Sequence, residues 1–173
     1  MALDLPEMGE HSWRQIVWRI MAYCGIDPGR DKFGLAVAGG TGGENLLFSA
    51  ILPLTAIGIV SECLHSGDFG DVSEWRAENL SKLLVFDIRA LFVGNGTGLD
   101  FFRRKFDESG ILYNIINERM TTLEGRDLYW KLHPPSGLWK YIPLSLRTPG
   151  RPIDDLAAWA ILMRGIKNDP VLT

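Results

Sequence analysis

The stretch Met21–Gly29 reads Met-Ala-Tyr-Cys-Gly-Ile-Asp-Pro-Gly and is the part of the sequence that decides the fold. Residues 21–26 form a short, nearly continuous apolar run, which is typical of a strand buried on both faces of a sheet. Asp27-Pro28-Gly29 follows, and these residue types favour a turn. We therefore expect a central strand that ends at Asp27.

Two further runs with strand character follow this turn. They are Lys32–Ala38 and Asn45–Leu52, and the glycine-rich stretch Gly39–Gly43 separates them. Apolar and β-branched residues bounded by glycine are typical of hairpin strands. We therefore expect the chain to begin as three antiparallel strands joined by short turns.

The pattern then changes to alternating helices and strands. Apolar residues at helical spacing predict helices at 56–64, from Ser73 to Ile88, at 99–107, at 121–131 and from Ile153 onward. Short apolar runs predict strands at 90–94 and 111–118, and the segment 133–151, rich in proline and glycine, is expected to be a loop. Three meandering strands followed by this alternation predict an α/β fold. Its sheet would be an RNase H-like mixed sheet of five strands with helices on both faces.

Length and composition limit the domain organisation. With 173 residues, 46% of them apolar, the chain can bury one core and is too short for two ordinary domains. We expect one domain over residues 21–173 and a helical N-terminal extension over residues 1–20. No stretch predicts a membrane span or a signal peptide, so we expect a soluble, cytoplasmic protein with no membrane partner. The net charge of −3 means that a nucleic-acid site would require a local basic patch.

Three acidic residues stand at the ends of predicted elements. Asp27 ends the first strand, Glu118 ends the strand 111–118, and Asp154 opens the last helix beside Asp155. Each acid also has a local explanation, because Asp-Pro-Gly favours turns and carboxylates favour helix N-termini. The predicted topology would gather all three at one edge of the sheet, where their repulsion calls for a cation. Carboxylate ligands favour Mg²⁺ or Mn²⁺, and two such ions can hydrolyse a phosphodiester without a protein nucleophile.

Three motifs in the same order resemble the YqgF/RuvX family, whose members are RNase H-like Holliday junction resolvases or nucleases of the 16S rRNA precursor. The first is Tyr23–Gly29 with Phe33–Ala38, the second is Glu118–Glu124, and the third is Ile153–Ala158. The resemblance covers roughly residues 21–166. It implies a metal-dependent nuclease with Asp27, Glu118 and Asp154 as catalytic metal ligands, Asp155 as an alternative or additional ligand, and Arg119 facing a phosphate.

Two segments depart from that family's pattern. Asn117 stands where the family signature has an acid before the glutamate, and Val93–Gly98 is more similar to the corresponding domain of the Tex-type transcription-accessory proteins, which need not be active nucleases. The backbone of Asn95, Gly96 and Thr97 could hold a phosphate at the start of the next helix, although the alternative is an ordinary strand-to-helix turn. Arg151 belongs to a group of cations expected near the same edge of the sheet.

Three functions remain open from the sequence. The first is a metal-dependent endonuclease acting on structured RNA or branched DNA, with a homodimer expected if it resolves four-way junctions by two symmetric cuts. The second is a nucleic-acid-binding or scaffolding module that has lost catalysis, which Asn117 and the acidic pI near 5.6 would fit. The third is an actin-like ATPase, which also begins with a strand and an Asp-x-Gly turn. The length of this chain argues against the ATPase, because such enzymes enclose a nucleotide between two domains and 173 residues suffice for one.

Overall fold

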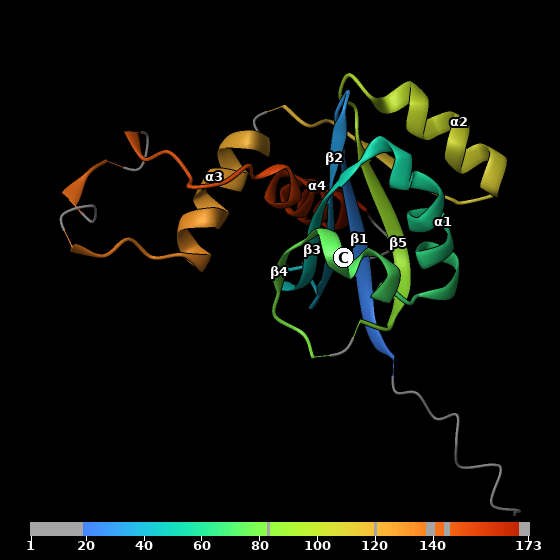
Figure 1. Ribbon diagram of the computed structural model, residues 1–173, viewed down its shortest axis with the longest axis horizontal. Coiled ribbons are helices and arrows are strands. Elements are labelled where there is room, and N and C mark those ends of the chain that lie inside the picture. The colour runs from blue at the N-terminus through green and yellow to red at the C-terminus, as the bar shows by residue number, and fades with distance from the viewer. Residues whose placement is uncertain (1–18, 83, 120, 138–140, 144–145, 170–173) are drawn as a thin grey trace, which may run out of the picture.

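The sheet is mixed and has six strands among the residues that this computed structural model describes, 19–82, 84–119, 121–137, 141–143 and 146–169 (Figure 1). Its order is β4-β3-β2-β1-β5-β6. The first four strands pair antiparallel, and β5 and β6 are parallel to β1. The strands are β1 (Ile20–Pro28), β2 (Lys32–Gly39), β3 (Asn45–Pro53), β4 (Arg76–Asn79), β5 (Phe86–Gly94) and β6 (Asn114–Ile116).

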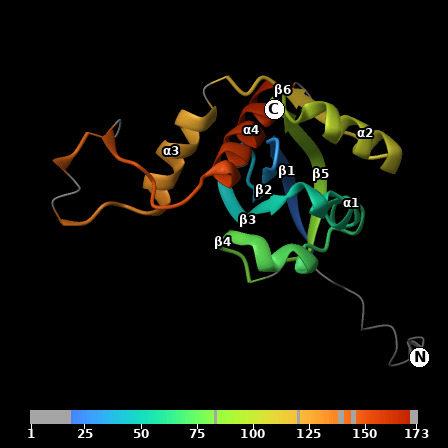
Figure 2. The ribbon, with the colours of Figure 1, turned by 45° about the horizontal axis from the view of Figure 1, so that its top comes forward.

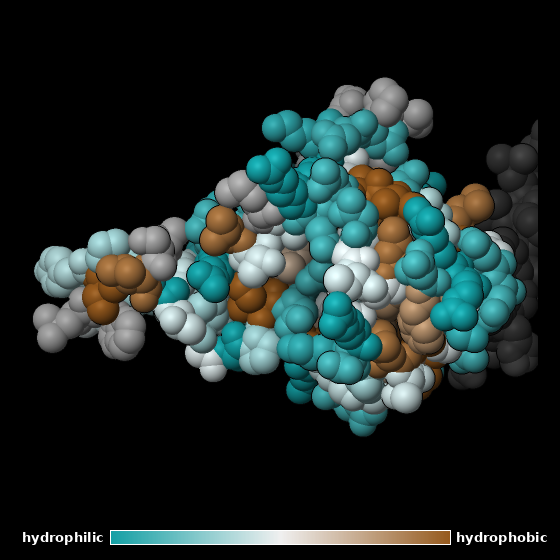
Figure 3. Space-filling view, turned by 90° about the horizontal axis from the view of Figure 1, so that it is seen from above, coloured by the Kyte–Doolittle hydropathy of each residue, from teal (hydrophilic) through white to brown (hydrophobic). Residues whose placement is uncertain are grey.

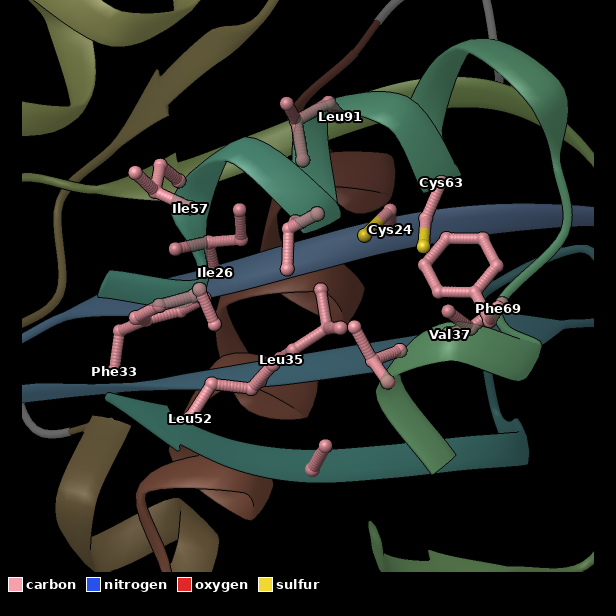
Figure 4. Close-up of a cluster of buried hydrophobic side chains, with 14 of the residues drawn as sticks. Cys24, Ile26, Phe33, Leu35, Val37, Leu52, Ile57, Cys63, Phe69 and Leu91 are labelled. Atoms are coloured by element: carbon pink, nitrogen blue, oxygen red, sulfur yellow. The ribbon is translucent and has the colours of Figure 1, made fainter. Parts of the chain in front are cut away.

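Helices cover both faces of this sheet (Figures 1 and 2). On one face, alternate residues of β1, β2, β3 and β5 pack against α1 (Ile57–Ser66) and α2 (Leu99–Ser109). Cys24 of β1 and Cys63 of α1 lie side by side in this layer as free thiols (Figure 4). On the other face, Ala36, Phe92 and Ile116 pack against α4 (Asp154–Asn168), and α3 (Thr121–Leu132) packs on α4. The predicted α/β fold, with a mixed sheet that begins as three antiparallel strands and has helices on both faces, is confirmed.

Helix α4 lies unusually close to the sheet because three positions lack side chains. A Cβ on Gly25 of β1 would overlap the Ala158 carbonyl oxygen, and a Cβ on Gly34 of β2 would overlap the Asp154 carbonyl oxygen. On the helix itself, a Cβ on Gly165 would overlap the Phe92 ring. These contacts fix both where α4 begins and how it crosses the strands.

The predicted helix from Ser73 to Ile88 is wrong. Residues 70–75 form a short 3₁₀ helix, 76–79 form β4, and β5 begins at Phe86 rather than at residue 90. Strand β4 pairs with β3, placing Ser49 opposite Glu78, and this pairing adds the sixth strand to the predicted five. Trp75 and Ile88 were predicted to lie on one side of that helix. They pack against the core from separate elements, the 3₁₀ helix and β5.

Strand β6 is also shorter than the predicted strand 111–118, because residues 111–113 and 117–118 are not part of it. The Ile111 amide instead donates to the Phe106 carbonyl at the end of α2, and Glu118 lies in the loop after β6 rather than at the end of the strand. Thr121 and Glu124 have the spacing of a capping box but do not form one. The Thr121 hydroxyl donates to the Glu118 carbonyl at 2.8 Å, and the Glu124 carboxylate accepts from Arg164. The predicted helices at 56–64, 99–107, 121–131 and from 153 are confirmed to within a few residues.

The predicted N-terminal helix falls almost entirely on residues 1–18, which lie outside the described residues, and β1 already begins at Ile20. After α3, residues 133–151 form the segment that we call the arm, and its described parts, 133–137, 141–143 and 146–151, extend away from the sheet (Figures 1 and 2). Figure 3 shows apolar surface on the arm, where Leu146 is 71% exposed. Within the described part of the chain, none of the helices has the length and apolar character needed to cross a membrane.

Candidate active site

Asp27 and Asp154 are brought together by the hairpin of β1 and β2. Asp27 pairs with Gly34 across that hairpin. Because Gly34 has no side chain, the first residue of α4 can lie directly on β2 at this point. The start of α4 is thereby placed beside the end of β1, and Asp154 acts electrostatically on Asp27.

Glu118 reaches the same place from the loop after β6. Its carboxylate occupies space left by two glycines, since a Cβ on Gly94 or Gly96 would lie 2.8 or 2.7 Å from Glu118 Oε2. The Asn95 side chain fixes this loop by accepting the Glu118 amide at 3.0 Å, while the Asn95 amide donates to the Ile116 carbonyl at 3.0 Å. The glycine-rich segment after β5 therefore holds Glu118 against Asp27.

The carboxyl groups of Asp27 and Glu118 perturb each other strongly. Burial, the Glu118 charge and then the Asp154 charge raise the pKa of Asp27 to about 7. Burial also raises the pKa of Glu118, partly offset by its hydrogen-bond contact with Asp27. That contact needs a proton between the two groups, because ionised carboxylates only accept. Without that proton, Glu118 Oε2 is buried and has no hydrogen-bond partner.

Lys32 is a member of this site that the sequence reasoning missed. Its Nζ donates to Asp154 Oδ2 at 2.8 Å, and its charge partly counteracts the rise in the pKa of Asp27. The available signal was its position as the first residue of the strand after the Asp27 turn. Among the residues described, no three His, Cys, Asp or Glu side chains form a group that could hold a metal ion in the arrangement seen. The ion pair between Lys32 and Asp154 gives a physical reason, because it occupies one oxygen of the third acid.

Asp155 is fully buried and has Ser49 and Arg151 as its partners. One oxygen accepts from the Ser49 hydroxyl at 2.6 Å, and Arg151 donates to both oxygens at 2.7 and 3.1 Å. Arg151 also donates to Glu78 of β4 at 2.7 Å and lies over the Tyr129 ring. Both Asp155, expected as a ligand, and Arg151, expected at the substrate, are thus engaged in a buried network that anchors α4 on the sheet.

The remaining predicted substrate contacts lie around Glu118. Arg119 is exposed and lines a cleft between α3 and α4, and Thr97 is exposed just before α2. Gly96 lies under the Glu118 carboxylate. One amide of the expected phosphate cradle, that of Asn95, already donates to the Ile116 carbonyl, and the amides of Gly98 and Leu99 that follow the cradle donate to the Pro28 and Gly96 carbonyls. The structure thus gives this loop the role of holding Glu118, and its role as a phosphate cradle stays a prediction.

Two solved structures of RuvC resemble this chain. Thermus thermophilus RuvC in complex with a Holliday junction substrate has 16% sequence identity and a TM-score of 0.45, over 83% of this chain and 91% of that one. A second Thermus thermophilus RuvC structure has 16% identity and a TM-score of 0.41, over 83% and 92%. No protein-family model and no curated protein matches the sequence. The α/β fold class rests on the observed strand order.

Proposed function

We propose that this protein is a divalent-metal-dependent nuclease whose metal ligands are Asp27, Glu118 and Asp154. The observation that carries the proposal is the buried contact between Asp27 and Glu118, in which Glu118 Oε2 has no hydrogen-bond donor. Two ionised carboxylates in such contact repel each other unless a proton or a cation lies between them. A divalent cation would satisfy the unpartnered oxygen and lower the pKa of Asp27, so the pair fits Mg²⁺ or Mn²⁺.

The three acids would have different parts in holding the metal. Asp27 and Glu118 are already in contact, whereas Asp154 would have to exchange Lys32 for the cation. When bound, a pair of such ions supplies an activated water and charge stabilisation at the leaving oxygen of a phosphodiester. The chain's own contribution is to hold the carboxylates in fixed positions, at the end of β1, on the loop after β6 that packs against Gly94 and Gly96, and at the start of α4.

Nucleic acid is the proposed substrate class. Residues 128–150 contain no Asp or Glu and carry three cations, Lys131, Lys140 and Arg147, in a chain of net charge −3. Such a local excess of positive charge is what binding to a phosphate backbone requires. Structured RNA and branched DNA both remain proposed substrates, in line with the resemblance to the YqgF/RuvX motifs. Junction resolution by two symmetric cuts would also require a homodimer.

The test is cleavage of a labelled single-stranded RNA and a labelled four-way DNA junction in Mn²⁺, Mg²⁺ or EDTA. We expect metal-dependent cutting by the wild-type protein and none by Asp27→Asn or Glu118→Gln. The matched control is Glu62→Gln, which changes an exposed acid of α1 and should cut normally. Equal cutting by Asp27→Asn and the wild type, or cutting in EDTA, would contradict the proposal.

The second candidate function is a nucleic-acid-binding module without catalysis. It is favoured by the ion pair between Lys32 and Asp154, because a permanent cation on the third acid can replace the metal. This candidate predicts binding of the same labelled RNA or junction without turnover, and an affinity unaffected by EDTA. Metal-dependent turnover by the purified wild-type protein, lost in Glu118→Gln, would exclude it.

A further inference from the structure

A cleft between α3 and α4 begins beside the candidate active site. Its volume is about 600 Å³, within the range of pockets that hold small ligands. Asn117 and Arg119, the two neighbours of Glu118, both line it. Its walls come from α3, which crosses α4 with Gly125 against the backbone of Ala157 (Figure 2). Anything bound in this cleft would therefore lie next to the loop that carries Glu118.

One guanidinium holds this cleft and the Glu118 loop together. Arg164 Nη1 donates to the Asn117 carbonyl at 2.6 Å and to the Arg119 carbonyl at 2.9 Å. Its Nη2 donates to Glu124 of α3 at 2.6 Å. Arg164 thus joins α4, α3 and the residues on either side of Glu118. The distance between the site and the cleft is fixed by these bonds.

The lining of the cleft combines positive charge with an apolar floor. Arg119, Lys131 and Lys167 line it, and none of the three has an ion pair among the described residues. Of the acids that face it, Glu124 is paired with Arg164, which leaves Asp127 as the unpaired one. Three cations against one acid leave the cleft positive in a chain of net charge −3. Its floor is made by the apolar residues Leu128, Ala160 and Met163.

We propose that this cleft binds a nucleotide of the nucleic-acid strand that flanks the cleaved bond. Lys131 and Lys167 would contact its phosphates, and the apolar floor would receive its base or sugar. Arg119 would guide the strand from the Glu118 loop into the cleft. The position of this nucleotide next to a cleaved bond rests on the proposed function. The binding of the nucleotide in the cleft can be tested without cleavage.

The experiment measures binding of a fluorescein-labelled single-stranded RNA in EDTA, by anisotropy at several NaCl concentrations. The double variant Lys131→Ala/Lys167→Ala should bind roughly tenfold more weakly, with a salt slope smaller by about 1.4, because two phosphate contacts on a single strand are lost. The control Arg76→Ala/Lys82→Ala removes two exposed cations from the β4 side of the sheet and should bind as the wild type. Wild-type affinity and slope in the first variant would overturn the proposal.

A second probe tests the floor of the cleft. An abasic oligonucleotide of the same length should bind the wild-type protein several-fold more weakly than the RNA, because base stacking and apolar contact are lost. Equal binding of the two probes, or equal binding of poly-glutamate, would overturn the assignment to a nucleotide. Absence of cleavage in all assays, together with binding that still depends on Lys131 and Lys167, would refute the proposed nuclease function and support nucleotide binding in the cleft. Metal-dependent cleavage by the wild type, together with wild-type binding by the Lys131→Ala/Lys167→Ala variant, would support the nuclease function and refute nucleotide binding in the cleft.

Discussion

Replacing Asp27 by Asn should stabilise the metal-free protein at alkaline pH. In the folded chain the pKa of Asp27 is raised to about 7 by burial and by the charges of Glu118 and Asp154, from an ordinary value of 3.8. Between these two pH values the unfolded chain has lost the proton and the folded chain retains it. Stability therefore falls as the pH rises through this window, and the full loss is reached above pH 7.

The size of the effect follows from the shift. At about 1.4 kcal/mol for each pH unit, ionised Asp27 lowers the free energy of unfolding by up to about 4 kcal/mol at pH 8. Asn is nearly isosteric and carries no charge, so Asp27→Asn should recover most of this loss at pH 8 and little of it near pH 4. For a chain of this size each recovered kcal/mol raises Tm by roughly 2–4 °C.

The assay is urea unfolding followed by Trp fluorescence, at pH 4 and pH 8 in EDTA, with Glu62→Gln as the control. We expect the gain from Asp27→Asn to appear at pH 8 only, and Mn²⁺ to stabilise the wild type there but not the variant. An equal difference at the two pH values would refute the reasoning, because it would show that neither burial nor the charge of Glu118 raises the pKa of Asp27 in the folded chain.

Three further predictions concern the residues that place the third acid. Gly34→Ala should weaken Mn²⁺ binding at least roughly tenfold, a loss of about 1.4 kcal/mol, because the added Cβ would displace the start of α4. The affinity is measured by calorimetry. The control Gly58→Ala, where the added Cβ meets open space, should leave Mn²⁺ binding unchanged. Asp155→Asn should lower the free energy of unfolding by about 3 kcal/mol in urea, because a buried ion pair loses one partner; a change below about 1 kcal/mol would contradict this. Lys32→Ala should tighten Mn²⁺ binding by roughly fivefold or less, since the ion pair on Asp154 is partly exposed. Weaker binding in that variant would mean that Lys32 assists the metal rather than competing with it.

The central hairpin and its acid were predictable because local sequence determines them. Residues 21–26 are apolar on both faces of the strand, and only a central strand can bury both. The predicted helix after Ser73 failed for the opposite reason. Arg76–Asn79 becomes a strand by pairing with β3, which is a contact between distant residues that periodicity does not record.

The candidate site was predictable in its acids but not in their surroundings. The positions of Asp27, Glu118 and Asp154 near the predicted element ends indicated one edge of the sheet. The structure puts Asp27 and Glu118 in contact and leaves Asp154 close enough to act electrostatically on Asp27, but no three acids of the described residues form a metal-holding group as they stand. The partners of each acid depend on side-chain packing. Lys32 on Asp154 and Ser49 on Asp155 join residues more than 100 positions apart, so spacing in the sequence gives no sign of either contact.

Both ends of the arm bind the same oxygen atom of β4. His133 at its start and Arg151 at its end both lie 2.7 Å from Oε1 of Glu78. For protein engineering, this makes residues 134–150 a natural cassette, since a short glycine linker could replace them or a foreign loop could be inserted between the same two anchors. A chain shortened in this way would retain the buried network around Asp155 and would allow the arm's contribution to be measured separately.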